Sequence, residues 1–327
     1  MAHMIDTVSI GRASYASTQR EWHGLGELMQ PNQTIEQWLQ AAGMEYKVQR
    51  AAIRYATSRL TEDAPLNALQ KIEDKLVLFR SDTGAPLGVV SDSYKVVQPS
   101  EVLEFFREWA ESGGMTIESA GVLFGGKRYF ATAKLAEGVY VDGANRDKVV
   151  PYVLLSTSAD GSLATEGRLT TVRVVCNNTL RMAMGTASSF KVSHRSKFKP
   201  EEARGVIEAA HEEFGAFMET SRKLAAIKVE THLAEEMTAL LLANGNRDKD
   251  AARESAGFQR IMSLFNGAGM GALMESTRET AWGWLNACTE YSDHHIRARS
   301  EENRTASALW GQGDALKARA LEIALAA

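Results

Sequence analysis

The residues best suited to chemistry in this sequence lie between Gly167 and Pro200. This stretch contains no aspartate or glutamate but carries seven lysines and arginines, in a chain whose formal net charge is −4. Such segments bind phosphodiester backbones, because each phosphate that a cation neutralises releases counterions. The alternative is a solvated basic face that pairs with the acid-rich helical stretch after Pro200. The seven cations are Arg168, Arg173, Arg181, Lys191, Arg195, Lys197 and Lys199.

A helix start is predicted inside this basic segment. Residues 167–185, GRLTTVRVVCNNTLRMAMG, alternate like a strand, halt at two asparagines and then take on helical character. Asn177 or Asn178 would cap a helix beginning near Leu180, whose free amides and partial positive charge suit a phosphate. Arg181 in the first turn opposes the helix dipole, and a bound anion would offset that cost. An ordinary strand-to-helix corner is the other interpretation.

A second cluster contains residue types that bind metals. NACTEYSDHH includes Glu290, Asp293, His294 and His295, and on a helix Glu290 and His294 would share one face. Adjacent histidines point in different directions, however, and the sequence has no His-Glu-x-x-His pattern. We therefore predict a polar helix face, with no metal site and no catalytic residues.

The glycine-rich stretch LFNGAGMGALMES fits neither nucleotide fingerprint. Gly267, Gly269 and Gly271 match the spacing of neither the P-loop nor the dinucleotide motif, and their flanks are helical. We predict a corner between helices here, and no cofactor.

Three segments would position these groups. Residues 1–98 mix short helices and hairpins: NQTIEQWLQAAGM contains a capping box at Thr34 and Gln37, and KLVLFRSDTGAPLGVVS is a hairpin. Residues 99–199 begin with a helix capped by Ser100. Residues 200–327 have helical spacing throughout.

The central segment should hold two further hairpins. The first turns at Gly125 and Gly126, with Lys127 and Arg128 directly after the turn, and the second turns at Asp160-Gly161. A helix followed by paired hairpins predicts an α+β fold, with an antiparallel hairpin-rich central domain and a C-terminal helical domain.

Composition restricts the cellular setting. The chain has 327 residues, 44% of them apolar, and its two cysteines are far apart. No disulfide framework, signal peptide or membrane-length apolar run is visible. We expect a cytoplasmic protein that does not contact membranes.

Several motifs in a fixed order resemble a known family. EWHGLG, AAGMEYKV, LGVVSDSYKVVQPSEVLEF, RVVCNNTL with VSHRSKF, TAWGWLNACTEYSDHH and LWGQGDALKARAL together resemble the phage/plasmid-like protein family. That family carries a domain of unknown function, and the resemblance implies an origin in a mobile element acting in a host cell.

A weaker, fold-level resemblance is to phage single-strand annealing proteins. It implies a basic groove, single-stranded DNA as the partner and a homo-oligomeric ring, with Lys127 and Arg128 on the wall opposite the basic segment. The leading hypothesis is therefore ATP-independent, non-enzymatic binding and annealing of single-stranded DNA in phage or plasmid recombination. The alternatives are a metal-dependent nuclease or nucleotide-processing enzyme that uses the Glu290–His295 cluster, and a mobile-element protein that disables a host defence factor.

Overall fold

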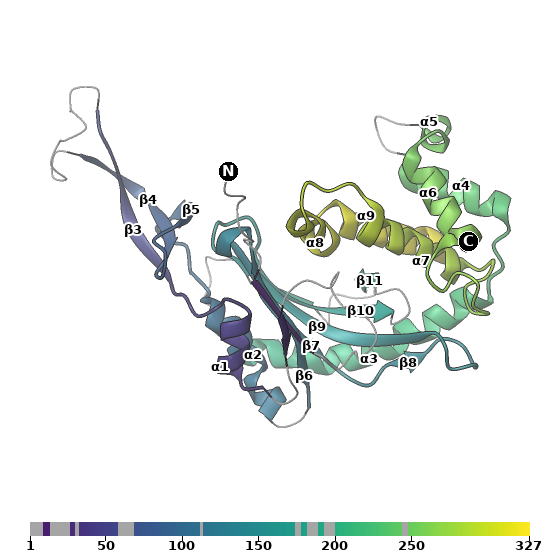
Figure 1. The fold of residues 1–327 in the computed structure, drawn as a ribbon, viewed down its shortest axis with the longest axis horizontal. Helices are drawn as coiled ribbons and strands as arrows, with labels where there is room; N and C mark the ends of the chain where they lie inside the picture. The colour runs from purple at the N-terminus through teal and green to yellow at the C-terminus, as the bar shows by residue number, and fades with distance from the viewer. Residues whose placement is uncertain are drawn as a thin grey trace.

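The fold is α+β, as predicted. A computed structural model describes residues 9–13, 27–29, 33–57, 69–111, 114–173, 178–181, 189–192, 200–243 and 248–327. Antiparallel strands dominate the N-terminal half and helices the C-terminal part (Figure 1). No helix within these ranges combines the length and the apolar composition that crossing a membrane requires.

A large central sheet forms the body. Its strand order is β11-β10-β9-β7-β6-β1-β2, with β12 also pairing with β10 and β8 with β9. Its described strand pairs are antiparallel except β1 with β2. The antiparallel pairs β6–β7 and β9–β10 are the two hairpins predicted for the central segment, and both are confirmed. The strands are β1 (Ser9–Ala13), β2 (Glu27–Met29), β6 (Thr116–Leu123), β7 (Arg128–Lys134), β8 (Val139–Tyr140), β9 (Lys148–Ser158), β10 (Thr165–Arg173), β11 (Asn178–Arg181) and β12 (Ser189–Val192).

Helices cover both faces of this sheet (Figure 1). Successive strand residues point to opposite faces, so Leu155 of β9 joins the main core whereas Leu154 packs with Leu309 in a smaller cluster. The first face carries α1 (Ile35–Ala41), α2 (Pro99–Glu111) and α3 (Pro200–Ala226), and the second carries α8 (Glu301–Trp310) and α9 (Gln312–Leu325).

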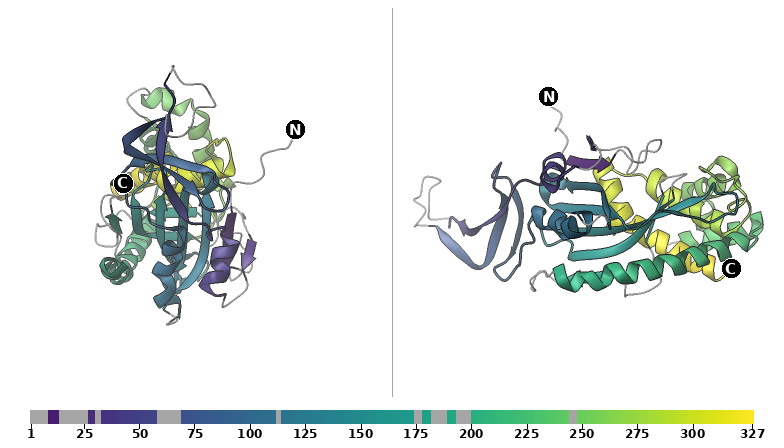
Figure 2. Two further views of the ribbon diagram at one scale, coloured as in Figure 1. Left: turned by 90° about the vertical axis from the view of Figure 1, so that its left-hand side faces the viewer. Right: turned by 90° about the horizontal axis from the view of Figure 1, so that it is seen from below.

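A second, three-stranded sheet projects away from the body as an arm (Figures 1 and 2). The arm comprises β3 (Val48–Tyr55), β4 (Gln70–Arg80) and β5 (Pro86–Ser91), in the order β3-β4-β5. Pro86 therefore lies on an edge strand, as its missing amide hydrogen requires. The predicted turn between β4 and β5 is confirmed, and Gly84 adopts a φ of 69° there.

The remaining helices pack at the C-terminal end of the body. Trp284 and Cys288 are fully buried in this core, and the Trp284 indole donates to the Thr238 hydroxyl over 2.9 Å. The glycine-rich stretch is a corner, as predicted, with a φ of 119° at Gly267. The elements are α4 (Thr231–Leu242), α5 (Lys249–Arg253), α6 (Ala256–Ser263), a helical turn (Leu264–Ala268), α7 (Ala281–Glu290) and a second helical turn (Tyr291–His295).

The capping signal predicted for α1 is confirmed, and the one predicted for α2 is wrong. Thr34 and Gln37 form the complete capping box, with the Thr34 amide donating to the Gln37 side chain over 2.8 Å. The cap predicted at Ser100 is wrong, because α2 already begins at Pro99. Proline suits the first helical position, where its missing amide hydrogen costs nothing.

Candidate nucleic-acid interface

The helix start predicted beside the asparagine pair is a strand instead. β11 pairs antiparallel with β10, placing Asn178 opposite Arg173 and Arg181 opposite Thr170. The prediction of a helix beginning near Leu180 is therefore wrong, because hydrogen bonds to β10 satisfy the backbone that a helix would have used. No helix N-terminus is present at residues 178–181 to bind a phosphate.

The register also separates the two arginine positions of this hairpin. Residues paired across a sheet share a face, and neighbours along a strand alternate. Position 181 therefore shares a face with position 170, whereas position 173 lies on the opposite face. The structure describes only the backbone at Arg173, Asn178, Arg181 and Lys191, and Asn177, Arg195, Lys197 and Lys199 lie outside the described residues. Their contact with DNA stays a prediction.

Arg168 directs its charge into the protein. Its side chain is only 5% exposed. The guanidinium Nη1 lies 3.1 Å from a Glu166 carboxylate oxygen and 3.2 Å from an Asp314 carboxylate oxygen, and Nη2 donates to the Leu309 carbonyl. This placement is a third case that the sequence did not indicate, because Arg168 is buried instead of solvated, and its acidic partners lie on its own strand and on α9. Arg168 therefore fastens β10 to α8 and α9.

Lys127 and Arg128 lie at the junction between the central sheet and the arm. Both follow the 3₁₀ turn Phe124–Gly126 that links β6 to β7. Lys127 is exposed, and the Arg128 guanidinium lies 5.4 Å from the centroid of the Phe124 ring. Arg80 of β4 donates to the Gly125 carbonyl over 3.2 Å, so the arm is bonded to this same turn.

Arg80 is the centre of this junction. Its guanidinium lies 3.9 Å from the centroid of the Tyr46 ring and donates to both Asp82 carboxylate oxygens, over 3.0 and 2.7 Å. This bidentate contact lowers the pKa of Asp82 to about 2. The Tyr46 hydroxyl donates to the Gly126 carbonyl over 2.9 Å, and burial raises the pKa of Tyr46.

A groove of about 810 Å³ runs beside this junction, between the start of β3 and residues 94–98. We call it the arm groove. The side chain of Gln98 builds its inner end, because it accepts from the Val48 amide over 2.8 Å and donates to the Val48 carbonyl over 3.1 Å. Gln98 thus occupies the place of a partner strand at the start of β3 and fixes the two walls relative to each other.

Tyr94 connects the groove to the central sheet. Its hydroxyl donates to the Ser158 carbonyl over 2.8 Å, and burial raises its pKa to about 12. Ser158 is the β9 residue that pairs with Arg128 of β7. The groove wall is therefore bonded directly to β9, which pairs with β7, the strand that begins at Arg128 just after Lys127.

The side chains of the arm groove combine aromatic rings with cations. Phe79 and Tyr94, both half-buried, line it together with the exposed Arg50 and Lys95. Because Phe79 pairs with Gln49, its side chain and that of Arg50 leave opposite faces of the arm sheet. The one lining carboxylate, that of Glu101, accepts a hydrogen bond from the Gln98 amide over 2.6 Å. Rings that stack on bases and cations that neutralise phosphates are the two components of non-specific single-strand binding.

Arg50, Phe79, Tyr94 and Lys95 were not identified from the sequence. The adjacent Tyr94 and Lys95 in SDSYKVVQPS provided a weak local signal. Arg50 and Phe79 lie on strands that pair with each other, and their proximity to residues 94–98 depends on tertiary structure.

The acidic and histidine cluster is held by structural contacts. A Glu290 carboxylate oxygen accepts the Met270 amide over 3.0 Å, and Asp293 binds the buried Lys317 ammonium over 2.8 Å. Over the ranges that the structure describes, no group of three or more His, Cys, Asp or Glu residues is arranged to hold a metal ion. His295 stands 3.8 Å from Glu290, and burial together with Arg260 lowers the pKa of His295.

Comparison with known proteins gives one family and one distant relative. The family model described as "Domain of unknown function (DUF932)" matches residues 86–310. A kinesin-like protein, KIN-14H of Arabidopsis thaliana, is 26% identical over 215 residues, which are 62% of this chain and 19% of the kinesin. The chain thus spans about a fifth of that relative's length. No solved structure matches the chain.

Proposed function

We propose that this chain, which belongs to the DUF932 family of unknown function, binds single-stranded DNA through the arm groove and anneals complementary strands without ATP. The arm groove supports the proposal because two aromatic residues, Phe79 and Tyr94, and two cationic residues, Arg50 and Lys95, border the same hollow. Stacking accepts any base, and the cations contact phosphates, so binding would be strong at low salt and tolerant of sequence.

The basic segment would extend the track for the strand. In this proposal Lys127 and Arg128 continue the path from the groove across the end of the central sheet. The residues predicted to add phosphate contacts farther along are Arg173, Arg181, Lys191, Arg195, Lys197 and Lys199.

The biological setting is also proposed. The resemblance to phage/plasmid-like proteins favours DNA of a mobile element, in a host-cell cytoplasm, and recombination as the process. Annealing further requires that two DNA strands be held side by side. A homo-oligomer of this chain would hold them in this way, and a ring is its simplest closed form.

A binding and annealing assay tests the function. The purified protein is titrated into a labelled single strand with and without magnesium, and then into two complementary strands whose pairing is followed by energy transfer. We expect binding and accelerated annealing in both buffers, no cleavage, and a sedimentation mass above that of a monomer. Absence of binding at low salt would contradict the proposal, and magnesium-dependent cleavage would favour the nuclease alternative.

The groove itself is tested by removing its rings. Phe79→Ala should weaken single-strand binding by about five- to 150-fold, because base–ring stacking contributes about 1–3 kcal/mol. The matched control is Val89→Ala, which removes an exposed apolar side chain on β5 of the same sheet. Equal affinities for Phe79→Ala and the wild type would show that the strand binds elsewhere.

A further inference from the structure

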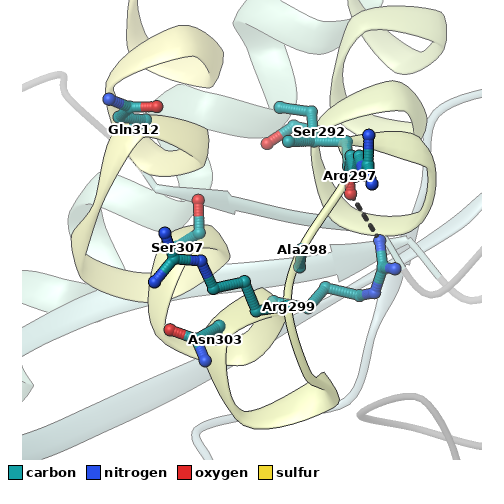
Figure 3. A pocket seen from close by; sticks show the side chains of 9 residues that line it. Ser292, Arg297, Ala298, Arg299, Asn303, Ser307 and Gln312 are labelled. Atoms are coloured by element: carbon teal, nitrogen blue, oxygen red, sulfur yellow. Dashed lines mark hydrogen bonds between the residues drawn. The ribbon is translucent and has the colours of Figure 1, made fainter.

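A second hollow lies where the chain passes from the turn Tyr291–His295 into α8 and α9. Its volume is about 250 Å³. Figure 3 shows the residues around it: Arg297, Ala298 and Arg299 come from the connection, Asn303 and Ser307 from α8, and Gln312 from the start of α9. We call it the arginine pocket.

The lining of this pocket is strongly positive. Three arginines line it, at positions 297, 299 and 304, and no lining residue carries a carboxylate. Within the described part of the chain, the acid that contacts the lining is Glu301, whose carboxylate lies 3.3 Å from Arg304 Nε. Even after that pair is discounted, two lining cations stay uncompensated.

Arg304 is a rigid part of the wall. Its Nη1 donates to the His294 carbonyl over 3.1 Å and to the Ile296 carbonyl over 2.8 Å, as the dashed line in Figure 3 marks for Ile296. These bonds fix the connection over α8. They also hold the backbone that carries Arg297 and Arg299.

Arg297 and Arg299 are the available cations. Both are exposed, and no hydrogen bond or ion pair joins either of them to another residue in the part of the chain that the structure describes. Both border the same hollow, with Arg297 beside Ser292 and Arg299 extending toward Ser307 and Asn303 in Figure 3, so an anion held in the hollow lies between the two cations. Arginine offers paired N–H donors that match the oxygens of a phosphate.

Neutral hydrogen-bonding groups complete the lining. Ser307 and Ser292 are already engaged, since the Ser307 hydroxyl accepts the Gly313 amide over 3.2 Å and the Ser292 hydroxyl donates to the Gly313 carbonyl over 3.0 Å. These bonds join the pocket floor to the beginning of α9. The Gln312 side chain is exposed at the rim and adds an amide donor.

We propose that the arginine pocket binds a phosphate dianion, either as inorganic phosphate or as the terminal group of a phosphomonoester. Its volume is below the range of about 300–1,000 Å³ that encloses whole small-molecule ligands, so it fits the phosphate group and leaves any attached nucleoside outside. This site lies apart from the arm groove and does not depend on single-strand binding there.

Titration calorimetry with the full chain tests the site, with inorganic phosphate, AMP and adenosine as probes. The variants are Arg297→Gln/Arg299→Gln, the charge-preserving Arg297→Lys/Arg299→Lys, and the control Arg278→Gln, which alters an exposed arginine outside the pocket lining. We expect phosphate to bind the wild type and adenosine not to bind. The glutamine variant should lose at least about tenfold in affinity, because charge-assisted hydrogen bonds are removed, and the lysine variant should lose less.

Two outcomes would overturn the proposal: no heat from phosphate or AMP up to about 10 mM, or equal affinities in the wild type and the glutamine variant. Tighter binding of AMP than of inorganic phosphate would identify a phosphomonoester as the ligand, and equal binding would identify the free anion. A single strand with a 5′-hydroxyl separates this site from the groove. The affinity of this strand should be the same for the glutamine variant and for the wild type. If the strand binds neither protein, only the proposed function is contradicted.

Discussion

At the scale of single residues, Arg80 determines how the arm meets the body. Its guanidinium contacts the Tyr46 ring, the Asp82 carboxylate and the Gly125 carbonyl at once. The negative charge of Asp82 balances the positive charge of Arg80 beside the buried Tyr46 ring. The junction therefore depends on the ion pair between Arg80 and Asp82, and the Asp82 carboxylate is exposed to solvent.

The titration of Asp82 follows from this geometry. Its pKa is lowered from 3.8 to about 2, first by the Arg80 hydrogen bonds. The pair therefore stabilises the fold above the unfolded value near 3.8, and this contribution is lost as the pH falls toward 2. Carboxyl-carbon NMR should show Asp82 charged at pH 3, and Arg80→Gln should return its pKa to about 3.8. An unchanged pKa in the variant would contradict this assignment.

Arg168 is predicted to be a stability residue. Its buried guanidinium lies between the Glu166 and Asp314 carboxylates, so Arg168→Ala would remove the cation that neutralises these two largely buried acids and cost about 3–5 kcal/mol in the free energy of unfolding. Arg168→Met combined with Glu166→Gln and Asp314→Leu removes all three charges and should recover much of that loss. Urea unfolding measures both. An unfolding free energy within about 0.5 kcal/mol of the wild type for Arg168→Ala would contradict the burial of this side chain.

Residue types alone could not distinguish Arg168 from its neighbours in the basic segment. Its partner Asp314 lies 146 residues away along the chain, and no local pattern encodes such a separation. In contrast, the capping box of Thr34 and Gln37 spans three residues and was identified from the sequence.

At the scale of elements, close backbone contacts at α7 restrict what its sequence can carry. A Cβ added at Gly283 would stand 1.8 Å from the Thr277 carbonyl oxygen. Gly283→Ala should therefore destabilise the protein by about 1–3 kcal/mol or more, since the helix must move away from the preceding turn.

Gly215 is the matched control within α3. Nothing lies within 4 Å of a Cβ built there, so Gly215→Ala should raise the unfolding free energy by about 0.5–1 kcal/mol. Thermal unfolding of the two variants should give shifts of opposite sign. Equal shifts would contradict the packing described for α7.

Hairpins and isolated helices were predictable because their signals are local. Gly84 and the pair Gly125 and Gly126 mark turns by their backbone freedom, and all three adopt positive φ. The helix predicted near Leu180 failed for the opposite reason. The asparagine pair is compatible with both a cap and a turn, and the availability of an edge of β10 decides between them.

At the scale of the whole molecule, the arm and the body together create the candidate interface. β3 and β4 carry Arg50 and Phe79, the segment before α2 carries Tyr94 and Lys95, and Gln98 bonds the two parts together. The charge pattern of the sequence pointed to residues 167–200 and did not indicate this groove. The groove could not be located from the sequence, because its two walls, the start of β3 and residues 94–98, are brought together only by tertiary structure.

The salt dependence of single-strand binding by the wild type and by Arg50→Gln/Lys95→Gln tests the central claim most directly. Fluorescence anisotropy would be measured from about 50 to 200 mM salt, with Arg278→Gln as the control. If both cations contact phosphates, the slope of log K against log salt should become shallower by about 1.4, roughly 0.7 for each cation removed, and the control should match the wild type. Tight binding whose slope and affinity are the same in all three proteins would contradict the arm groove as the site.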